Sequence, residues 1–169
     1  MKRVFSIPLV VVIVLALFVS VSSVIYAAPM SGAIWTTDST GTRVNQNIYN
    51  SSLDVFLNGG PKSSGAPGLP DGYYYVKVTS PSGQVLGSSV GGSAGDVTTV
   101  QVINGRFAQI YQLWYIVRSA YSNFENAGYN NTPNHGNEYK VWFSQDPYFA
   151  NSSSKTDNFK VLHDSPCVP

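Results

Sequence analysis

The chain has 169 residues, of which 43% are hydrophobic, 13% aromatic and 11% charged, with a formal net charge of +1. This apolar and aromatic content excludes an intrinsically disordered chain, and the balanced charge gives no electrostatic reason to expect nucleic acid or an anionic membrane surface as a partner. Charged residues are few while Gly, Ser, Asn and Thr are plentiful, a combination typical of an extracellular β-protein rather than a cytosolic one.

Residues 1–27 have the pattern of a secretory signal peptide: a basic start, a long apolar run, and small residues at the cleavage site between Ala27 and Ala28. Cleavage there removes Lys2 and Arg3, two of the ten basic residues, and leaves a near-neutral chain with nine acidic residues. The alternative is an uncleaved anchor over residues 4–28, which is long enough to span a bilayer. We expect a secreted, extracellular or cell-envelope protein that contacts a membrane only through this segment, if it is not cleaved.

After the leader, we expect a flexible lead at residues 28–32, one domain at 33–162 and a tail at 163–169. Short β-rich runs separated by turn residues predict seven to eight strands in the domain. These runs fall at residues 33–37, 53–58, 73–79, 84–86, 97–103, 106–117, 138–144 and 157–162. No amphipathic helix is predicted beyond the signal helix, so the pattern indicates an all-β fold, an antiparallel β-sandwich or barrel.

The strand predicted at residues 53–58 alternates, with Leu53, Val55 and Leu57 toward the core and Phe56 pointing away from it. The Gly-, Pro- and Ser-rich residues 59–68 that follow have no apolar anchor. We therefore expect them to form an exposed loop.

The clearest hairpin lies at residues 68–86. Turn residues at 70–72 and 81–83 flank an aromatic and β-branched run that alternates between two faces. We expect one face to be buried, and it carries Tyr74, Val76 and Val78. We expect the other face to point outward, and it carries Tyr73, Tyr75, Lys77 and Thr79.

Asn104-Gly105 predicts a second hairpin, because this pair adopts the turn that matches the twist of the flanking strands. The run that follows, residues 106–117, is apolar on both faces. We interpret it as a central strand covered on both sides or as the source of an exposed patch. Residues 119–136 are rich in Asn and Gly, and we expect a long loop with at most one helical turn.

Two parts of the chain carry familiar motifs. Residues 68–79, Gly-Leu-Pro-Asp-Gly-Tyr-Tyr-Tyr-Val-Lys-Val-Thr, resemble the L-P-x-G-x-Y-x-V-x-V-T hairpin of prealbumin-like domains, which include collagen-adhesin B-type repeats and carboxypeptidase regulatory-like domains. Residues 137–142 and 155–161 are similar to the closing strands of uncharacterised secreted bacterial proteins with the same hairpin. The similarity spans roughly residues 32–162. It implies a prealbumin-like or immunoglobulin-like β-sandwich of the kind found in adhesins, stalks and envelope proteins, and does not by itself give a function.

Collagen-adhesin B-type repeats often carry a Lys–Asn isopeptide bond, which the resemblance would place between an early and a late strand. Asn158 is suitably placed as the late partner. However, no lysine lies between Ala28 and Leu57, and the first lysine after the leader is Lys62, in a predicted loop. We therefore expect no isopeptide bond.

Catalytic groups are sparse. The only two histidines are His135 and His163, no Gly-x-Ser-x-Gly elbow is present, and the acidic residues are scattered. Two histidines and one distant cysteine do not make a zinc site, and Asp38 and Asp54 lack the dense ligand pattern of a calcium loop. We therefore expect a non-enzymatic protein without metal or other cofactor. A hydrolase centred on His135 is the alternative.

Cys167 is the only cysteine and has no partner within the chain. A domain of this length folds without disulfides. Cys167 is therefore available for an intermolecular disulfide or as a reactive thiol, or it is a tail cysteine with no role.

Aromatic side chains are the best candidates for a binding surface. Tyr73 and Tyr75 are predicted to point outward, and Phe56, Trp114 and Trp142 also lie opposite the expected core side of their strands. Rings among polar neighbours suit contact with carbohydrate or protein. We expect a binding, adhesion or envelope-structure protein whose partner at the cell surface is a protein or a carbohydrate. Alternatively, a loop covers these rings or a bulge reverses the assigned faces.

Overall fold

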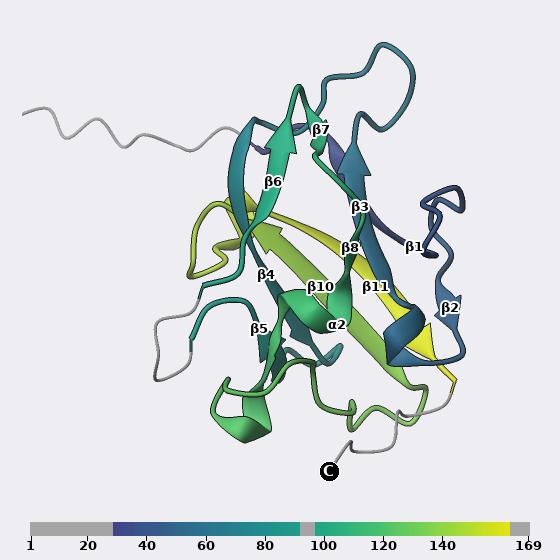
Figure 1. Ribbon diagram of the computed structural model, residues 1–169, viewed down its shortest axis with the longest axis vertical. Coiled ribbons are helices and arrows are strands. Elements are labelled where there is room, and N and C mark those ends of the chain that lie inside the picture. The colour runs from purple at the N-terminus through teal and green to yellow at the C-terminus, as the bar shows by residue number, and fades with distance from the viewer. Residues whose placement is uncertain (1–28, 92–96, 163–169) are drawn as a thin grey trace, which may run out of the picture.

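The structure, a computed structural model, describes residues 29–91 and 97–162 (Figure 1). Its strands are β1 (Ala33–Thr37), β2 (Ile48–Tyr49), β3 (Phe56–Gly60), β4 (Gly72–Thr79), β5 (Val85–Ser88), β6 (Val100–Ile103), β7 (Arg106–Phe107), β8 (Tyr111–Gln112), β9 (Arg118–Ser119), β10 (Glu138–Ser144) and β11 (Ser154–Val161). The helical elements are one-turn pieces: η1 (Ser52–Asp54), α2 (Leu113–Ile116), η2 (Ala120–Ser122) and η3 (Asn151–Ser153). The prediction of an all-β protein is confirmed. The predicted signal helix, its cleavage site at Ala27 and Ala28, and Cys167 lie outside the described residues.

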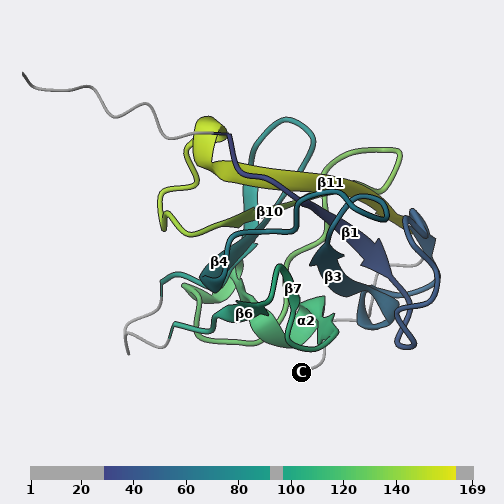
Figure 2. The same ribbon diagram turned by 90° about the horizontal axis from the view of Figure 1, so that it is seen from above.

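The strands form two sheets. One has the order β1–β3–β8, and the other runs β2–β11–β10–β4–β5–β9, with β6 and β7 attached through β4. The strand pairs in the described ranges are antiparallel except for β2 with β11, which are parallel. Figure 2 shows β10 and β11 along one side of the molecule and β6, β7 and α2 along the opposite side.

β4, which comes from the Tyr-rich run, lies in the middle of the larger sheet. Residues 72–74 pair with β6, whereas residues 77–79 pair with β5. Where the two partners separate, Ser89 bonds twice to Val76: its N–H donates to the Val76 carbonyl at 2.7 Å, and its Oγ accepts from the Val76 N–H at 2.8 Å. The other edge of β4 pairs with β10 over residues 75–79. β4 therefore has hydrogen-bonded partners on both edges, which fixes its register.

The core contains buried residues from both sheets and is rich in aromatic rings. The inward-facing set predicted for the strand at 73–79 is confirmed, because Tyr74, Val76 and Val78 are buried. In β10 the alternate residues Tyr139, Val141 and Phe143 are buried, which agrees with the assignment of Trp142 to the side opposite the core. The Tyr74 and Phe143 rings stack with their centroids 4.2 Å apart, and Phe107 packs on Phe143 at 4.9 Å. Burying one such side chain stabilises the fold by roughly 1.5–3 kcal/mol.

A polar contact joins the smaller sheet to β11. Asp157 of β11 lies opposite Val141 and so shares its inward face. Its carboxylate accepts the Thr36 N–H at 2.7 Å and the Thr36 hydroxyl at 3.0 Å. Thr36 belongs to β1 and is fully buried, so Asp157 satisfies two buried donors where the sheets meet.

The prediction of one long strand at residues 106–117 is wrong. The Asn104-Gly105 turn is present, with φ of 52° and 76°, but β7 ends at Phe107. The chain then joins the smaller sheet as β8 and turns into α2, whose buried residues Leu113 and Ile116 are three positions apart. Residues at that spacing share one face of a helix, which explains why the run looked apolar on both faces of a strand.

The segment at residues 52–60 also differs from its prediction. Leu53 lies in η1, not in a strand, and is 40% exposed; Ser51 and Asp54 form the capping box of this turn. Val55 and Leu57 are buried as predicted. Gly59 and Gly60, expected in an exposed loop, are buried in β3, and a Cβ on Gly59 would collide with the Phe107 ring. Glycine is therefore needed here for close packing rather than for a flexible loop.

Candidate functional site

The candidate site is the outer face of β4, β10 and β11, the side turned away from the core. Because the inner residues of these strands are buried, a one-residue slip would carry lysines into the core, so the register is strongly specified. The outer residues are aligned in cross-strand pairs: Tyr75 with Ser144, Lys77 with Trp142, Thr79 with Lys140, Trp142 with Thr156, Lys140 with Asn158, and Glu138 with Lys160. Three of these side chains are lysines and one is a carboxylate.

Three of these side chains, Lys77, Lys140 and Trp142, form a lysine–aromatic cluster with Phe149. The Lys77 Nζ lies 5.0 Å from the centroid of the Trp142 ring and 4.4 Å from that of Phe149. The Lys140 Nζ lies 4.9 Å from the Trp142 centroid. The Trp142 indole N–H donates to the Thr79 hydroxyl at 3.1 Å, which fixes the orientation of the ring. These distances are within the range of cation–π attraction.

Phe149 reaches the cluster from the loop between β10 and β11. Asp146 shapes this loop: its carboxylate oxygens accept the Tyr148 N–H at 2.9 Å and the Ala150 N–H at 3.2 Å, and its carbonyl accepts the Phe149 N–H at 3.1 Å. Phe149 itself has a φ of 56° and is buried, while Tyr148 is exposed. The turn therefore folds one aromatic ring onto Lys77 and leaves the next one in solvent.

Neither Lys77 nor Lys140 forms an ion pair with a carboxylate in the described part of the chain. The ion pairs found there join Arg43 to Asp38 and Lys160 to Glu138. Burial lowers the pKa of Lys77, because its ammonium group is partly removed from water. The cluster therefore holds two positive charges beside one indole ring without a protein counter-ion among the described residues.

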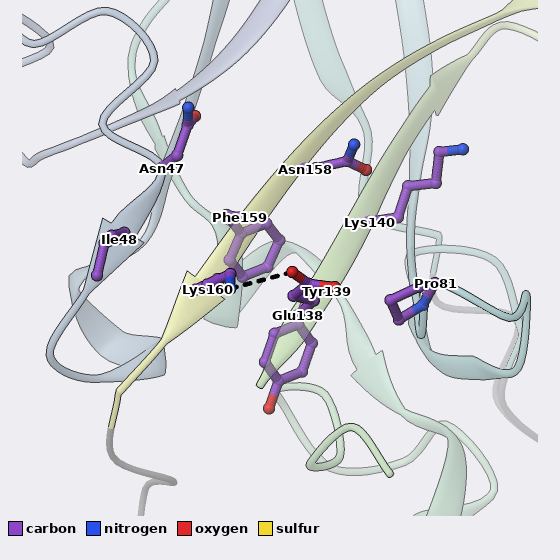
Figure 3. Close-up of a pocket in the computed structure, with 9 residues that line it drawn as sticks. All are labelled: Asn47, Ile48, Pro81, Glu138, Tyr139, Lys140, Asn158, Phe159 and Lys160. Carbon is purple, nitrogen blue, oxygen red and sulfur yellow. Dashed lines mark ion pairs between the residues drawn. The ribbon is translucent and has the colours of Figure 1, made fainter. Parts of the chain in front are cut away.

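A groove of about 490 Å³ lies on the same face, next to the cluster. Figure 3 shows it across β2, β11 and β10, with the β4–β5 turn at its other side. The Lys160 Nζ and Glu138 Oε1 are 3.0 Å apart at its centre, and Lys140 and Asn158 lie side by side on neighbouring strands. Its lining residues are Asn47, Ile48, Pro81, Glu138, Tyr139, Lys140, Asn158, Phe159 and Lys160. Lys140 belongs to both the groove and the cluster, so the two form one continuous surface.

Three of the five aromatic residues proposed from the sequence lie on the outward parity of β4 and β10. Tyr73, Tyr75 and Trp142 lie on the outer face of β4 and β10. Tyr73 is 63% exposed, and its hydroxyl accepts a bond from the Gln101 side-chain amide at 3.3 Å. Tyr75 and Trp142 are half-buried. The positions of these three residues agree with the predicted alternation of the two strands, and Trp142 lies opposite Lys77, two positions after Tyr75.

Trp114 and Phe56 lie elsewhere. Trp114 is on α2, where its ring centroid is 5.6 Å from that of Tyr129 and its edge covers Gly128. Phe56 lines a second pocket, of about 530 Å³, beside Asp38 and Asp54. Trp114 therefore lies away from the outer face, on the side of the molecule that carries α2 (Figure 2). The Phe56 pocket adjoins the groove, because Ile48 lines both.

Sequence reasoning did not identify Lys77, Lys140 or Phe149 as site residues. The two lysines lie on the outward parity of strands that were predicted correctly, so alternation places them on the same face as Tyr75 and Trp142. Their contact with one ring depends on the pairing of β4 with β10, which alternation does not give. Phe149 comes from a loop in which no periodic pattern signals that the ring is buried.

Of the groups considered for catalysis or metal binding, Asp38 and Asp54 line the same pocket, and His135 is not among its lining residues. His135 is exposed, Asp38 accepts bonds from Thr40 and pairs with Arg43, and the Asp54 carboxylate accepts the Ser51 N–H. Within residues 29–91 and 97–162, no three His, Cys, Asp or Glu side chains are grouped so as to hold a metal ion. The same ranges contain no helix long and apolar enough to cross a membrane. His163 lies outside them.

Comparison of the chain with protein-family models, curated proteins and solved structures gives no significant match. The prealbumin-like resemblance therefore depends on sequence motifs, chiefly those at residues 68–79, 137–142 and 155–161. What the site can do chemically follows from its own groups. It offers two ammonium groups without an ion pair, a third ammonium group paired with a carboxylate, amide side chains and aromatic rings on a sheet face.

Proposed function

We propose that this chain is a secreted or cell-envelope protein with a prealbumin-like β-sandwich, that it works by binding rather than by catalysis, and that its ligand is an extracellular carbohydrate. The observation that carries the proposal is the groove on the outer face, whose lining residue Lys140 also contacts the Trp142 ring. The signal-peptide pattern of residues 1–27 supports export. Adhesion or envelope structure is then the role that such binding would serve.

Carbohydrate is favoured because the groove offers both apolar and polar contacts, and a sugar has both apolar C–H groups and polar hydroxyl groups. Ile48 and Pro81 offer apolar contact to ring C–H groups, and Asn47 and Asn158 offer amide donors and acceptors to hydroxyls. Ile48 and Asn158 lie on β2 and β11, Asn47 directly precedes β2, and Pro81 lies in the tight turn between β4 and β5. Strands hold a binding geometry more closely than long loops do. An open groove on a sheet face also lets a polymer chain pass along it.

The groove lining supports binding rather than cleavage. Glycoside hydrolysis generally uses two carboxyl groups that flank the scissile bond. Among the lining residues Glu138 is the one carboxylate, and it is 3.0 Å from the Lys160 ammonium. A hydrolase at this position would therefore lack its second acid among the residues that the structure describes here.

The proposal is tested by affinity electrophoresis and glycan arrays with the purified full chain. We expect retention on at least one polysaccharide, and loss of most of that retention in Trp142→Ala. The matched control is Tyr121→Ala, which removes an aromatic side chain that is 70% exposed in η2, away from the outer face. Absence of glycan binding, or equal losses in both variants, would overturn carbohydrate binding at this face.

Export is tested separately by fractionating the native cells and sequencing the N-terminus of the protein. We expect a chain that begins at Ala28 outside the cytoplasm, or an intact chain in the membrane fraction if the leader is retained as an anchor. An intact, soluble cytoplasmic chain would contradict the proposed location.

A further inference from the structure

The Trp142 ring contacts two lysine ammonium groups. It therefore positions these charges rather than offering a free surface on which a ligand could stack. Lys77 reaches over it from β4 and Lys140 from two residues earlier on β10, at 5.0 and 4.9 Å from the ring centroid. Stacking of a neutral sugar on this ring would require an ammonium group to move aside. The arrangement instead fixes two positive charges close to the groove.

The site therefore attracts an anion more strongly than scattered surface lysines would. Both ammonium groups lack an ion-paired carboxylate in the described ranges, and Lys77 is half-buried between the Trp142 and Phe149 rings. A charge partly removed from water interacts more strongly with an opposite charge than a fully solvated one does. A carboxylate from the ligand would supply the missing counter-ion.

The number and spacing of positive charges on the outer face indicate which class of anionic ligand fits there. Two unpaired ammonium groups, and a third tied to Glu138, lie along the stretch of β10 from Glu138 to Trp142, which is about 13 Å long at ~3.3 Å per residue. The neighbouring outer positions on β11, Thr156 and Asn158, are polar and uncharged. This pattern fits a polymer with one negative charge per sugar better than a densely sulfated chain or a nucleic acid.

We propose that the carbohydrate bound on the outer face is a polyuronate, a chain of sugars that each carry one carboxylate. This inference rests on the proposed function and names its ligand class. Lys77 and Lys140 pair with carboxylates of the chain, and Asn47 and Asn158 bond to its hydroxyls. Trp142 is a positioning residue that holds both ammonium groups where the groove meets the cluster.

The first test compares polygalacturonate with its fully methyl-esterified form, which has the same backbone without the negative charges. Binding of the purified full chain to both is measured by titration calorimetry. We expect the acid form to bind at least about 10-fold more tightly, which corresponds to one well-formed charged contact. Raising the ionic strength should weaken binding of the acid form, because salt screens the contact.

The second test uses charge-removing variants that keep the aliphatic stem. Lys77→Met and Lys140→Met should each weaken polygalacturonate binding about 10-fold or more, while Lys140→Arg, which keeps the charge, should retain most of it. Lys62→Met is the matched control, because Lys62 is exposed in the loop between β3 and β4. Thermal unfolding of each variant verifies that it is folded.

The positioning role of Trp142 predicts non-additivity. Trp142→Leu should weaken binding in the native background but have little further effect when Lys77 and Lys140 are both methionine, because the ring acts through them. An effect of equal size in both backgrounds would contradict this role.

The outcomes separate the inference from the function on which it rests. Equal binding of the two galacturonan forms without dependence on the lysines would overturn the polyuronate inference and leave carbohydrate binding standing. Preferential binding of dextran sulfate or of polyglutamate would also overturn it, in favour of a sulfated chain or an acidic peptide. Absence of binding to any polysaccharide would overturn both.

Discussion

The two faces of β10 carry aromatic rings with different neighbours. On the inner face Phe143 stacks on Tyr74 at 4.2 Å, and Tyr139 stacks on Phe159 at 5.2 Å. On the outer face the neighbours of Trp142 are the ammonium groups of Lys77 and Lys140. The inner rings are buried, whereas Trp142 is half-buried.

The difference shows that aromatic content is a poor guide to recognition until the neighbours of each ring are known. Rings packed on other rings stabilise the core through burial. A half-buried ring that contacts charged groups contributes less to stability and more to the placement of those charges. We therefore expect substitutions on the inner face to lower the free energy of unfolding and substitutions on the outer face to lower affinity for ligand.

The largest expected effect is that of Phe143→Ala. It leaves a cavity beside Tyr74 and Phe107 and should lower the free energy of unfolding by about 3–5 kcal/mol. The measurement is urea denaturation followed by circular dichroism. Trp142→Ala is the outer-face counterpart and should cost clearly less. Equal losses in the two variants would show that the faces do not differ as described.

High pH should destabilise the fold through its inner-face tyrosines. Burial raises the pKa of Tyr49 to about 12, and burial together with the Asp71 carboxylate raises that of Tyr74 to about 12. The unfolded chain loses these protons near pH 10, so stability is full below pH 10 and falls between pH 10 and about 12. The slope approaches roughly 1.4 kcal/mol per pH unit for each tyrosine. Tyr74→Phe should flatten the slope measured by denaturation across this range, and an unchanged slope would contradict the assignment.

Asp157 and Asn158 are consecutive on β11, and the first faces the core while the second faces outward. Substituting each in turn therefore compares a buried-side polar group with an outer-face one. Asp157→Ala leaves the buried Thr36 N–H and hydroxyl without their acceptor and should cost about 1–3 kcal/mol. Asn158→Ala removes an exposed outer-face amide and should change stability by less than about 0.5 kcal/mol. The comparison is made by thermal unfolding. A larger loss in Asn158→Ala would reverse the assigned faces of β11.

The smallest effect is expected for the ion pair at the centre of the groove. Lys160 and Glu138 are both partly exposed, and solvent screens their attraction. Glu138→Gln should lower the free energy of unfolding by about 0.2–1 kcal/mol, with the difference shrinking at high salt. A loss that is insensitive to salt would indicate that the pair has a structural role beyond electrostatics.

Much of the fold could be predicted from alternation. The inward sets Tyr74, Val76 and Val78 and Tyr139, Val141 and Phe143 follow from a period of two, and Asn104-Gly105 marks its hairpin through turn chemistry. The prediction of a single strand at residues 106–117 was wrong, because this segment contains a helical turn. The turn buries residues three positions apart, which in a strand would lie on opposite faces, so both faces looked apolar.

Less of the candidate site could be predicted. The outward parity of Tyr75, Lys77 and Trp142 is visible in the sequence, but the contact of Lys77 with Trp142 depends on register between strands that are distant in the chain. Phe149 is buried because hydrogen bonds to Asp146 turn the loop, a tertiary effect without a periodic signal. Trp114 was assigned to a strand face because its helical turn was not recognised.

The most direct measurement follows the indole N–H signals of Trp35, Trp114 and Trp142 in a ¹H–¹⁵N spectrum while polygalacturonate is added. Trp35 lies in β1 and Trp114 on α2, and neither lines the groove or belongs to the lysine–aromatic cluster, so both serve as internal references. We expect the Trp142 signal to shift saturably while the other two stay in place. Binding that shifts Trp114 or Trp35 and leaves Trp142 unchanged would show that the outer face is not the binding surface.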